Sequence, residues 1–97
     1  MPQIRTTSSG WADVYALASA ASVAEGGPAI PVGTPLLVQN QSSDRASFQI
    51  RSTAPDVTDN TGRWLASGVE AVVTSGAAGC YMRGGFNGVQ AYVQVNA

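Results

Sequence analysis

The sequence predicts an all-β fold: a single antiparallel β-sandwich or small β-barrel with an extended N-terminal arm. Several short runs alternate apolar and polar residues, as strands with one buried face do. Glycine and proline separate these runs in the manner of turns. The 97 residues are enough for one modest core. We therefore divide the chain into an arm, residues 1–10, which is polar and without periodicity, and a single β domain, residues 11–97.

The stretch "GTPLLVQNQSSDRASFQIRS", residues 33–52, predicts two strands joined by a polar turn. Residues 35–40 form a mostly apolar run, and residues 46–52 alternate, with Phe48 and Ile50 on one face. The Asn, Ser and Asp side chains between these runs can bond the nearby backbone, as turn residues do. We expect a β-hairpin here.

The second half of the chain predicts a long connection and then further strands. "TAPDVTDNTGRW", residues 53–64, is rich in turn residues and is a candidate crossover from one sheet to the other, which sandwich topologies require. "GVEAVVTSG", "GCYMRGG" and "GVQAYVQVN" follow, with glycines between them. Their alternation predicts strands with one apolar face.

Residues 11–25, "WADVYALASAASVAE", fit two local structures. Alanine favours a helix, whereas Trp, Val and Tyr favour a strand. We expect a strand over about residues 11–17, followed by a loose Ala/Ser loop. The alternative is a short helix within residues 16–25. In the helical interpretation Ser9 is the cap and Gly26 the terminator.

The residue types that most catalysis needs are missing from the chain. It has no histidine and no lysine, so a serine nucleophile lacks these bases and a phosphate-binding loop lacks its lysine. Asp56, Asp59 and Asn60 do not have the spacing of an EF-hand loop, and we interpret them as turn residues. The single Cys80 cannot form an intramolecular disulfide and is expected to be a small buried residue. We expect no enzyme, no cofactor and no metal.

Charge and hydropathy exclude further classes of partner. Charged residues make up 11% of the chain, against about 25% in ordinary soluble domains, and the net charge is −1. The five arginines are spread along the sequence, unlike the basic cluster of a nucleic-acid-binding protein. No run approaches the roughly 20 apolar residues of a membrane span, and no signal peptide is visible. We expect no nucleic acid, no membrane, and synthesis in the cytoplasm.

The aromatic residues leave two interpretations open. Together with Trp11, Tyr15 and Tyr92, the side chains of Trp64 and Tyr81 could form a sugar-stacking platform. For Trp11, Tyr15 and Trp64 we prefer a place in the core or at its rim, where aromatic residues of small domains usually lie. Glutamines at alternating positions indicate a neutral polar sheet face: Gln39, Gln49, Gln90 and Gln94.

The order of these segments resembles small virion structural proteins of tailed bacteriophages. The resemblance is carried by "SSGWADVY", "VGTPLLVQNQSS", the Pro/Asp-rich connection, "GVEAVVTSG" and "GVQAYVQV". It implies an all-β, non-enzymatic protein of the virion, made in the host cytoplasm. The implied role is capsid decoration (cement), in which the protein bridges and stabilises capsid subunits. The alternatives are a tail, collar or fibre component, or a carbohydrate-binding module in host recognition.

Under this hypothesis the partners are the major capsid protein or other virion proteins, and the chain forms a homo-oligomer on the particle. We expect the arm to reach neighbouring subunits, whereas the carbohydrate-binding alternative would use Trp64 or Tyr81. The candidate partner-binding residues are Ile4, Arg5, Thr6, Thr7, Trp64 and Tyr81.

Overall fold

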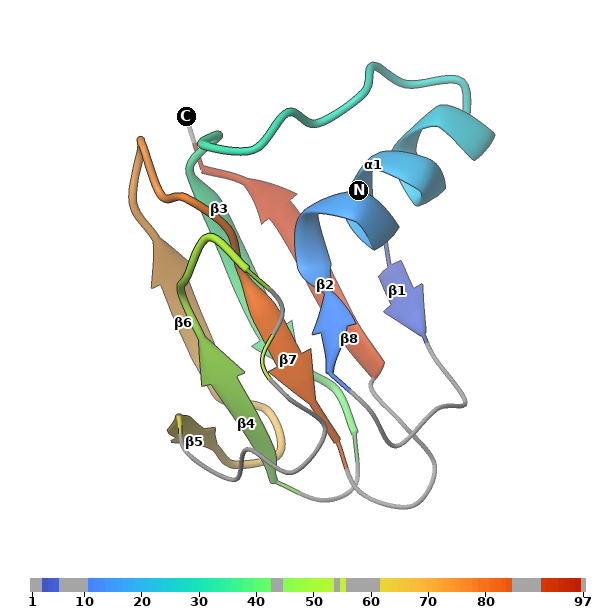
Figure 1. Cartoon of the computed structure of the whole chain (residues 1–97). Coiled ribbons are helices and arrows are strands. Elements are labelled where there is room, and N and C mark those ends of the chain that lie inside the picture. The colour runs from blue at the N-terminus through green and yellow to red at the C-terminus, as the bar shows by residue number, and fades with distance from the viewer. Residues whose placement is uncertain are drawn as a thin grey trace.

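Strands that alternate buried and outward-facing side chains form two four-stranded antiparallel sheets in this computed structural model. The structure describes residues 3–5, 11–42, 45–53, 55, 62–84 and 90–96. The first, called the β3 sheet, has the order β1 (Gln3–Arg5), β8 (Gln90–Val95), β3 (Leu36–Asn40) and β6 (Glu70–Val73). The second, called the β4 sheet, has the order β2 (Ala12–Asp13), β7 (Tyr81–Arg83), β4 (Ala46–Gln49) and β5 (Arg63–Leu65). The helix α1 (Val14–Ala24) lies beside β1 and β2 (Figure 1). The β-rich class is confirmed, and the arrangement is consistent with a β-sandwich.

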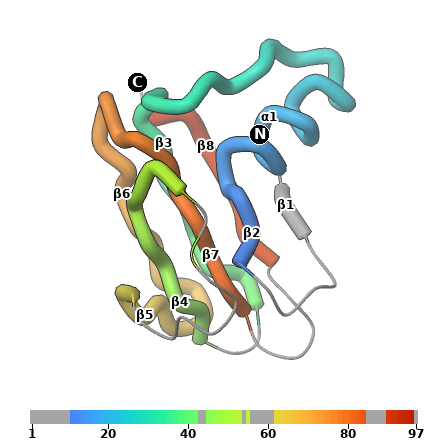
Figure 2. Tube along the Cα trace, viewed as in Figure 1, coloured from blue at the N-terminus to red at the C-terminus, as the bar shows by residue number. Residues whose placement is uncertain are grey.

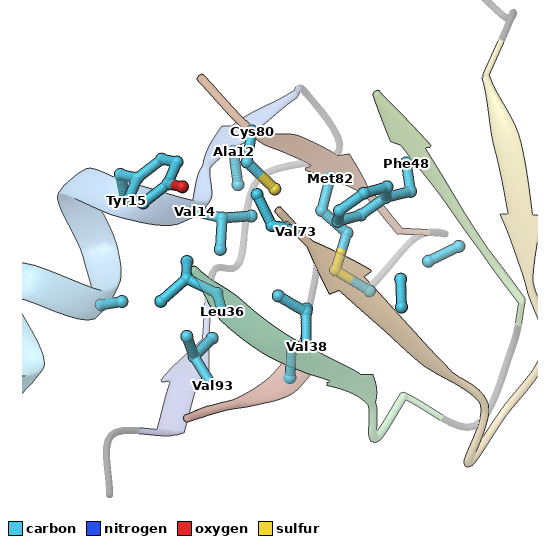
Figure 3. Packing of buried hydrophobic residues seen from close by; sticks show 14 of the residues in the cluster. Ala12, Val14, Tyr15, Leu36, Val38, Phe48, Val73, Cys80, Met82 and Val93 are labelled. Carbon is cyan, nitrogen blue, oxygen red and sulfur yellow. The ribbon is translucent and has the colours of Figure 1, made fainter. Parts of the chain in front are cut away.

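The two sheets turn their apolar side chains toward each other and form one hydrophobic core (Figure 3). Leu36 and Val38 enter it from the β3 sheet, and Phe48 and Met82 enter it from the β4 sheet. Burial of these faces against one another is the main stabilising contribution that such a pair of sheets has. The predicted alternation of residues 70–73 and 90–95 is confirmed, since the inward side chains there are buried: Ala71, Val73, Ala91 and Val93.

The predicted hairpin over residues 33–52 is wrong. The strands β3 and β4 both exist, but they belong to different sheets: β3 pairs with β8 and β6, whereas β4 pairs with β5 and β7. The chain therefore passes from one sheet to the other between Asn40 and Ala46, and Figure 2 shows β3 and β4 in separate layers. Periodicity shows which face of a strand is buried, but it does not identify the neighbouring strand.

The candidate crossover over residues 53–64 is also wrong, for the same reason. This segment leads from β4 into β5, and the two strands pair antiparallel within one sheet. Residues 54 and 56–61 of the connection lie outside the described residues. The strand β4 ends at Gln49, so Ile50, expected on the face of Phe48, follows the strand and is half-exposed.

The connection between β3 and β4 is held by the side chain of Asn40, which is fully buried. Its amide nitrogen donates to the Leu65 carbonyl oxygen at 2.9 Å, and its Oδ1 accepts from the Ser42 backbone N–H at 2.9 Å. The Gln90 backbone N–H in turn donates to Ser42 Oγ at 2.9 Å. Asn40 and Ser42 thus bond the end of β3 to β5 and to the start of β8.

The segment expected as a strand over residues 11–17 is mostly helical, so the alternative was the better interpretation. The strand β2 covers only Ala12–Asp13, and α1 begins at Val14. Asp13, and not Ser9, caps the helix: its carboxylate accepts from the Ala16 backbone N–H at 3.1 Å. The last helical residue is Ala24, with Glu25 as the C-cap, and Gly26, the expected terminator, follows with a φ of 83° in the left-handed region.

The loose Ala/Ser loop expected after residue 17 is helical as far as Ala24, and the residues that follow are bonded back onto the helix. Ser22 Oγ donates to the Pro28 carbonyl oxygen at 2.8 Å, and the Ile30 backbone N–H donates to Ser19 Oγ at 3.0 Å. Ile30 is buried in the core, and the Tyr15 hydroxyl donates to the Thr34 carbonyl oxygen at 2.7 Å. Residues 25–35 are therefore hydrogen-bonded to the helix, and Ile30 anchors them in the core, although most of the segment is exposed.

Part of the expected N-terminal arm lies in a sheet. Residues 3–5 form β1, which pairs antiparallel with β8, so that Gln3 faces Tyr92, Ile4 faces Ala91 and Arg5 faces Gln90 in the register. Residues 1, 2 and 6–10 lie outside the described residues.

Replacing Asn40 by alanine is expected to lower the free energy of unfolding by about 2–3 kcal/mol, because the Leu65 carbonyl and the Ser42 N–H each lose a buried partner. Urea denaturation followed by circular dichroism measures this. The matched control is Gln41→Ala at the exposed neighbouring position, expected within about 0.5 kcal/mol of the natural protein. Equal effects of the two substitutions would show that Asn40 has no special structural role.

Candidate functional site

The outer face of the β4 sheet gathers side chains that the sequence keeps far apart. In the register Trp64 of β5 lies opposite Ser47 of β4, and Ser47 lies opposite Arg83 of β7. Directly opposite residues of an antiparallel sheet point to the same side. Because Ala46, Phe48 and Met82 point into the core, this row points outward. The neighbouring row on this same face, two residues further along the strands, holds Gln49, Tyr81 and Asp13. We call this surface the β4 outer face; with Arg45 added, its residues are Asp13, Arg45, Ser47, Gln49, Trp64, Tyr81 and Arg83.

Trp64 is the most exposed aromatic side chain of the described residues, at 57%. The guanidinium carbon of Arg45 lies 4.1 Å from the centroid of its ring. This is a cation–π contact, which contributes about 0.5–1 kcal/mol at an exposed position. The contact holds the cation and the ring together on the protein surface and covers part of the ring.

Tyr81 is half-buried on the same face, between Gln49 and Asp13 in the register. It stands beside Gly79, where a Cβ would lie in ordinary contact with the Tyr81 ring and would collide with the Arg51 carbonyl oxygen. Because Gly79 has no side chain, the residues after β4 can approach the start of β7 closely. In this contact the Arg51 backbone N–H donates to the Gly79 carbonyl oxygen at 3.2 Å.

Four of the five arginines belong to the strands of the β4 sheet or to residues next to them, although they are dispersed in the sequence: Arg45, Arg51, Arg63 and Arg83. Arg51 also donates to the Gln49 side chain oxygen at 3.3 Å. Among the described acidic residues, Asp13 lies in this sheet at its far edge strand. Glu25 ends the helix, and Glu70 lies in the β3 sheet.

The outer face of the β3 sheet has a different character. Gln39 pairs with Tyr92 and Glu70, and Leu37 pairs with Gln94 and Val72. Val72 is 53% exposed. Gln39, Gln90 and Gln94 share this face as expected, but apolar Leu37 and Val72 and the acidic Glu70 lie among them, so the face is not the neutral polar one expected. Gln49 lies on the other sheet.

The structure brings together two of the predicted partner-binding residues and separates the others from them. Trp64 and Tyr81 share the β4 outer face, and the expectation that Trp64 lies in the core or at its rim is wrong. Tyr15, in contrast, is buried in the core as expected. Ile4 and Arg5 are placed by β1 in the β3 sheet. The remaining candidates, Thr6 and Thr7, lie outside the described residues, as do the turn residues Asp56, Asp59 and Asn60.

Sequence reasoning missed the arginines of this face. The signal available was the alternation of β4, which places residues 45, 47 and 49 on one side. The position of Arg45 over Trp64 depends in addition on the pairing of β4 with β5, which was not predicted.

The described residues contain no group of three or more His, Cys, Asp or Glu side chains placed to hold a metal ion. Cys80 is buried directly before β7, where its carbonyl oxygen accepts from the Val14 N–H at 3.0 Å. Burial, with a smaller effect from the charge of Asp13, raises the pKa of the Cys80 thiol to about 12. This thiol is therefore protonated at neutral pH and is a poor nucleophile.

Comparisons with protein-family models, curated proteins and solved structures found no significant match to this chain. In the described part of the structure, no helix has the length and apolar character needed to cross a membrane.

The raised pKa of Cys80 makes stability fall in alkaline solution. The unfolded thiol ionises near its ordinary value of 9.0, whereas the folded thiol keeps its proton to about 12. The folded state therefore loses stability as the pH rises from about 9 toward 12. Denaturant unfolding at increasing pH measures the fall.

The comparison for this experiment is Cys80→Ala. We expect this variant to be less stable at neutral pH because it loses buried volume, and its free energy of unfolding to decrease less steeply above pH 9. Some fall remains in the variant, because burial also raises the pKa of Tyr15. Identical alkaline slopes in the two proteins would contradict the assignment to Cys80.

Proposed function

We propose that this chain is a non-enzymatic structural protein of a tailed-bacteriophage virion, most specifically a capsid decoration protein that bridges and stabilises capsid subunits. The observation that supports a binding role is the half-exposed Trp64 with Arg45 over its ring on the β4 outer face. Trp, Tyr and Arg are the residues that most often dominate the energy of protein interfaces. This face presents all three.

The placement of the two candidate contact regions fits bridging. The strand β1, which carries Ile4 and Arg5, is an edge of the β3 sheet, and β5, which carries Trp64, is an edge of the β4 sheet. Figure 1 shows these two strands on opposite sides of the molecule. A protein with contacts on both sides can lie across a joint between two subunits. Such a bridge stabilises a shell by mass action and avidity, with no covalent step.

The second candidate function is a carbohydrate-binding module, which the exposure of Trp64 favours. Sugars stack on the open faces of aromatic rings, but Arg45 lies over the Trp64 ring at 4.1 Å. The contact leaves less ring surface for a sugar and adds a charged group at its side. Protein binding therefore accounts for the site better. A tail, collar or fibre position on the same particle uses the same face with a different partner.

The test is co-sedimentation of the purified protein with capsids that lack it, followed by heating of the complexes. We expect saturable binding that raises the capsid melting temperature. Trp64→Ala is expected to weaken binding by about tenfold or more, because a central interface Trp commonly contributes this much.

Val72→Ala is the matched control, since Val72 is similarly exposed but lies on the outer face of the other sheet. It is expected to bind as the natural protein does. A protein that stays in the supernatant contradicts the decoration role, and glycan-array binding that disappears in Trp64→Ala would then assign the carbohydrate function.

A further inference from the structure

We propose that the β4 outer face binds an acidic protein surface, with one carboxylate of the partner received by Arg45 over Trp64 and a second by Arg83, across Ser47 from Trp64. The inference rests on the proposed function and names the chemistry of its partner. Arg45 lies over Trp64, and Arg83 lies across β4 from Trp64 in the same row of the sheet.

The contact of Arg45 with the Trp64 ring leaves its N–H groups able to bind a carboxylate. A guanidinium over an aromatic ring presents a flat face to the ring, and its N–H groups lie in the guanidinium plane, where they can donate to a carboxylate in pairs. The ring also restricts the motion of a long side chain, so less conformational entropy is lost when a partner binds. Trp64 thus supports Arg45 and adds apolar contact area beside it.

The spacing of the row allows the face to receive two acidic side chains. Trp64 and Arg83 belong to strands on either side of β4, and neighbouring strands lie about 4.8 Å apart. The two positions are therefore separated by roughly 10 Å, with Ser47 between them. A partner strand or helix can place two carboxylates at such a distance, and the Ser47 hydroxyl can donate to either.

The charge of the whole chain favours a protein partner over a nucleic acid. A nucleic-acid-binding protein attracts phosphates through a dense positive field, mostly from lysine and arginine. This chain has a net charge of −1, five arginines and no lysine. Its attraction for anions is therefore local to the arginines and acts over the short range of paired hydrogen bonds.

The experiment titrates the full, isotopically labelled chain with a glutamate octapeptide and follows the spectrum by NMR. We expect the Trp64 indole N–H and the Arg45 side-chain N–H signals to move, with an affinity that decreases as salt is added. Arg45→Gln is expected to weaken binding by about tenfold, because it removes a charge-assisted pair of hydrogen bonds. Arg45→Lys, which retains the charge and loses the planar fork, is expected to recover only part of it.

Arg63→Gln is the matched control, because Arg63 adjoins Trp64 in β5 but lies opposite Phe48, in the row that alternates away from the β4 outer face. It is expected to change the affinity by less than about twofold. Equal weakening by Arg63→Gln and Arg45→Gln would overturn the proposal, as would the absence of any movement of the Trp64 signal. Tighter binding of a thymidine octanucleotide than of the glutamate peptide would overturn the choice of a protein partner.

The same variants separate this inference from the proposed function. If Arg45→Gln binds capsids as well as the natural protein does, the acidic-partner inference fails and the decoration role stands. If the glutamate peptide binds as described but no capsid is bound, the decoration role fails and the acidic-partner inference stands.

Discussion

The buried side chain of Asn40 makes hydrogen bonds where the chain leaves one sheet for the other, and the residues that form the β4 outer face depend on this connection. The amide bonds to Leu65 and Ser42 fix the end of β3 against β5 and the start of the crossover. A strand shifted by one residue turns every side chain to the opposite face. The register of β4 after this crossover therefore determines that Phe48 enters the core and Arg45 faces outward.

Strand positions could be predicted from the sequence because alternation depends only on which side of a strand is buried. The inward side chains of β6 and β8 follow this rule at every described position within residues 71–73 and 91–93. The neighbours of each strand could not be predicted, since a polar turn suits a hairpin and a crossover equally well. Asn40 has the appearance of a turn residue in the sequence, and its contact with Leu65, 25 residues away, is visible only in the folded chain.

The helix shows a similar limit of local information. Five of the eleven residues of α1 are alanine, which favours a helix, and the Trp and Tyr residues nearby favour a strand. Three interactions account for the helix: the Asp13 cap, the burial of Val14 and Ala18, and the hydrogen bond from Tyr15 to Thr34. Two of these depend on tertiary contacts. Likewise, Trp64 and Tyr81 could be proposed as binding residues from their type, whereas Arg45 could not, because its position over Trp64 follows from the pairing of β4 with β5.

The low charge of the chain gives the position of each arginine more weight than it would have on a heavily charged surface. Where cations and anions are interspersed, their fields largely cancel and a single ion pair contributes little. Here four of five arginines belong to one sheet or its adjoining residues, and one of them is stacked on an exposed tryptophan. An acidic partner can displace water from the ring and satisfy the guanidinium in the same contact. Under the acidic-partner proposal, specificity arises from the paired geometry of arginine and carboxylate.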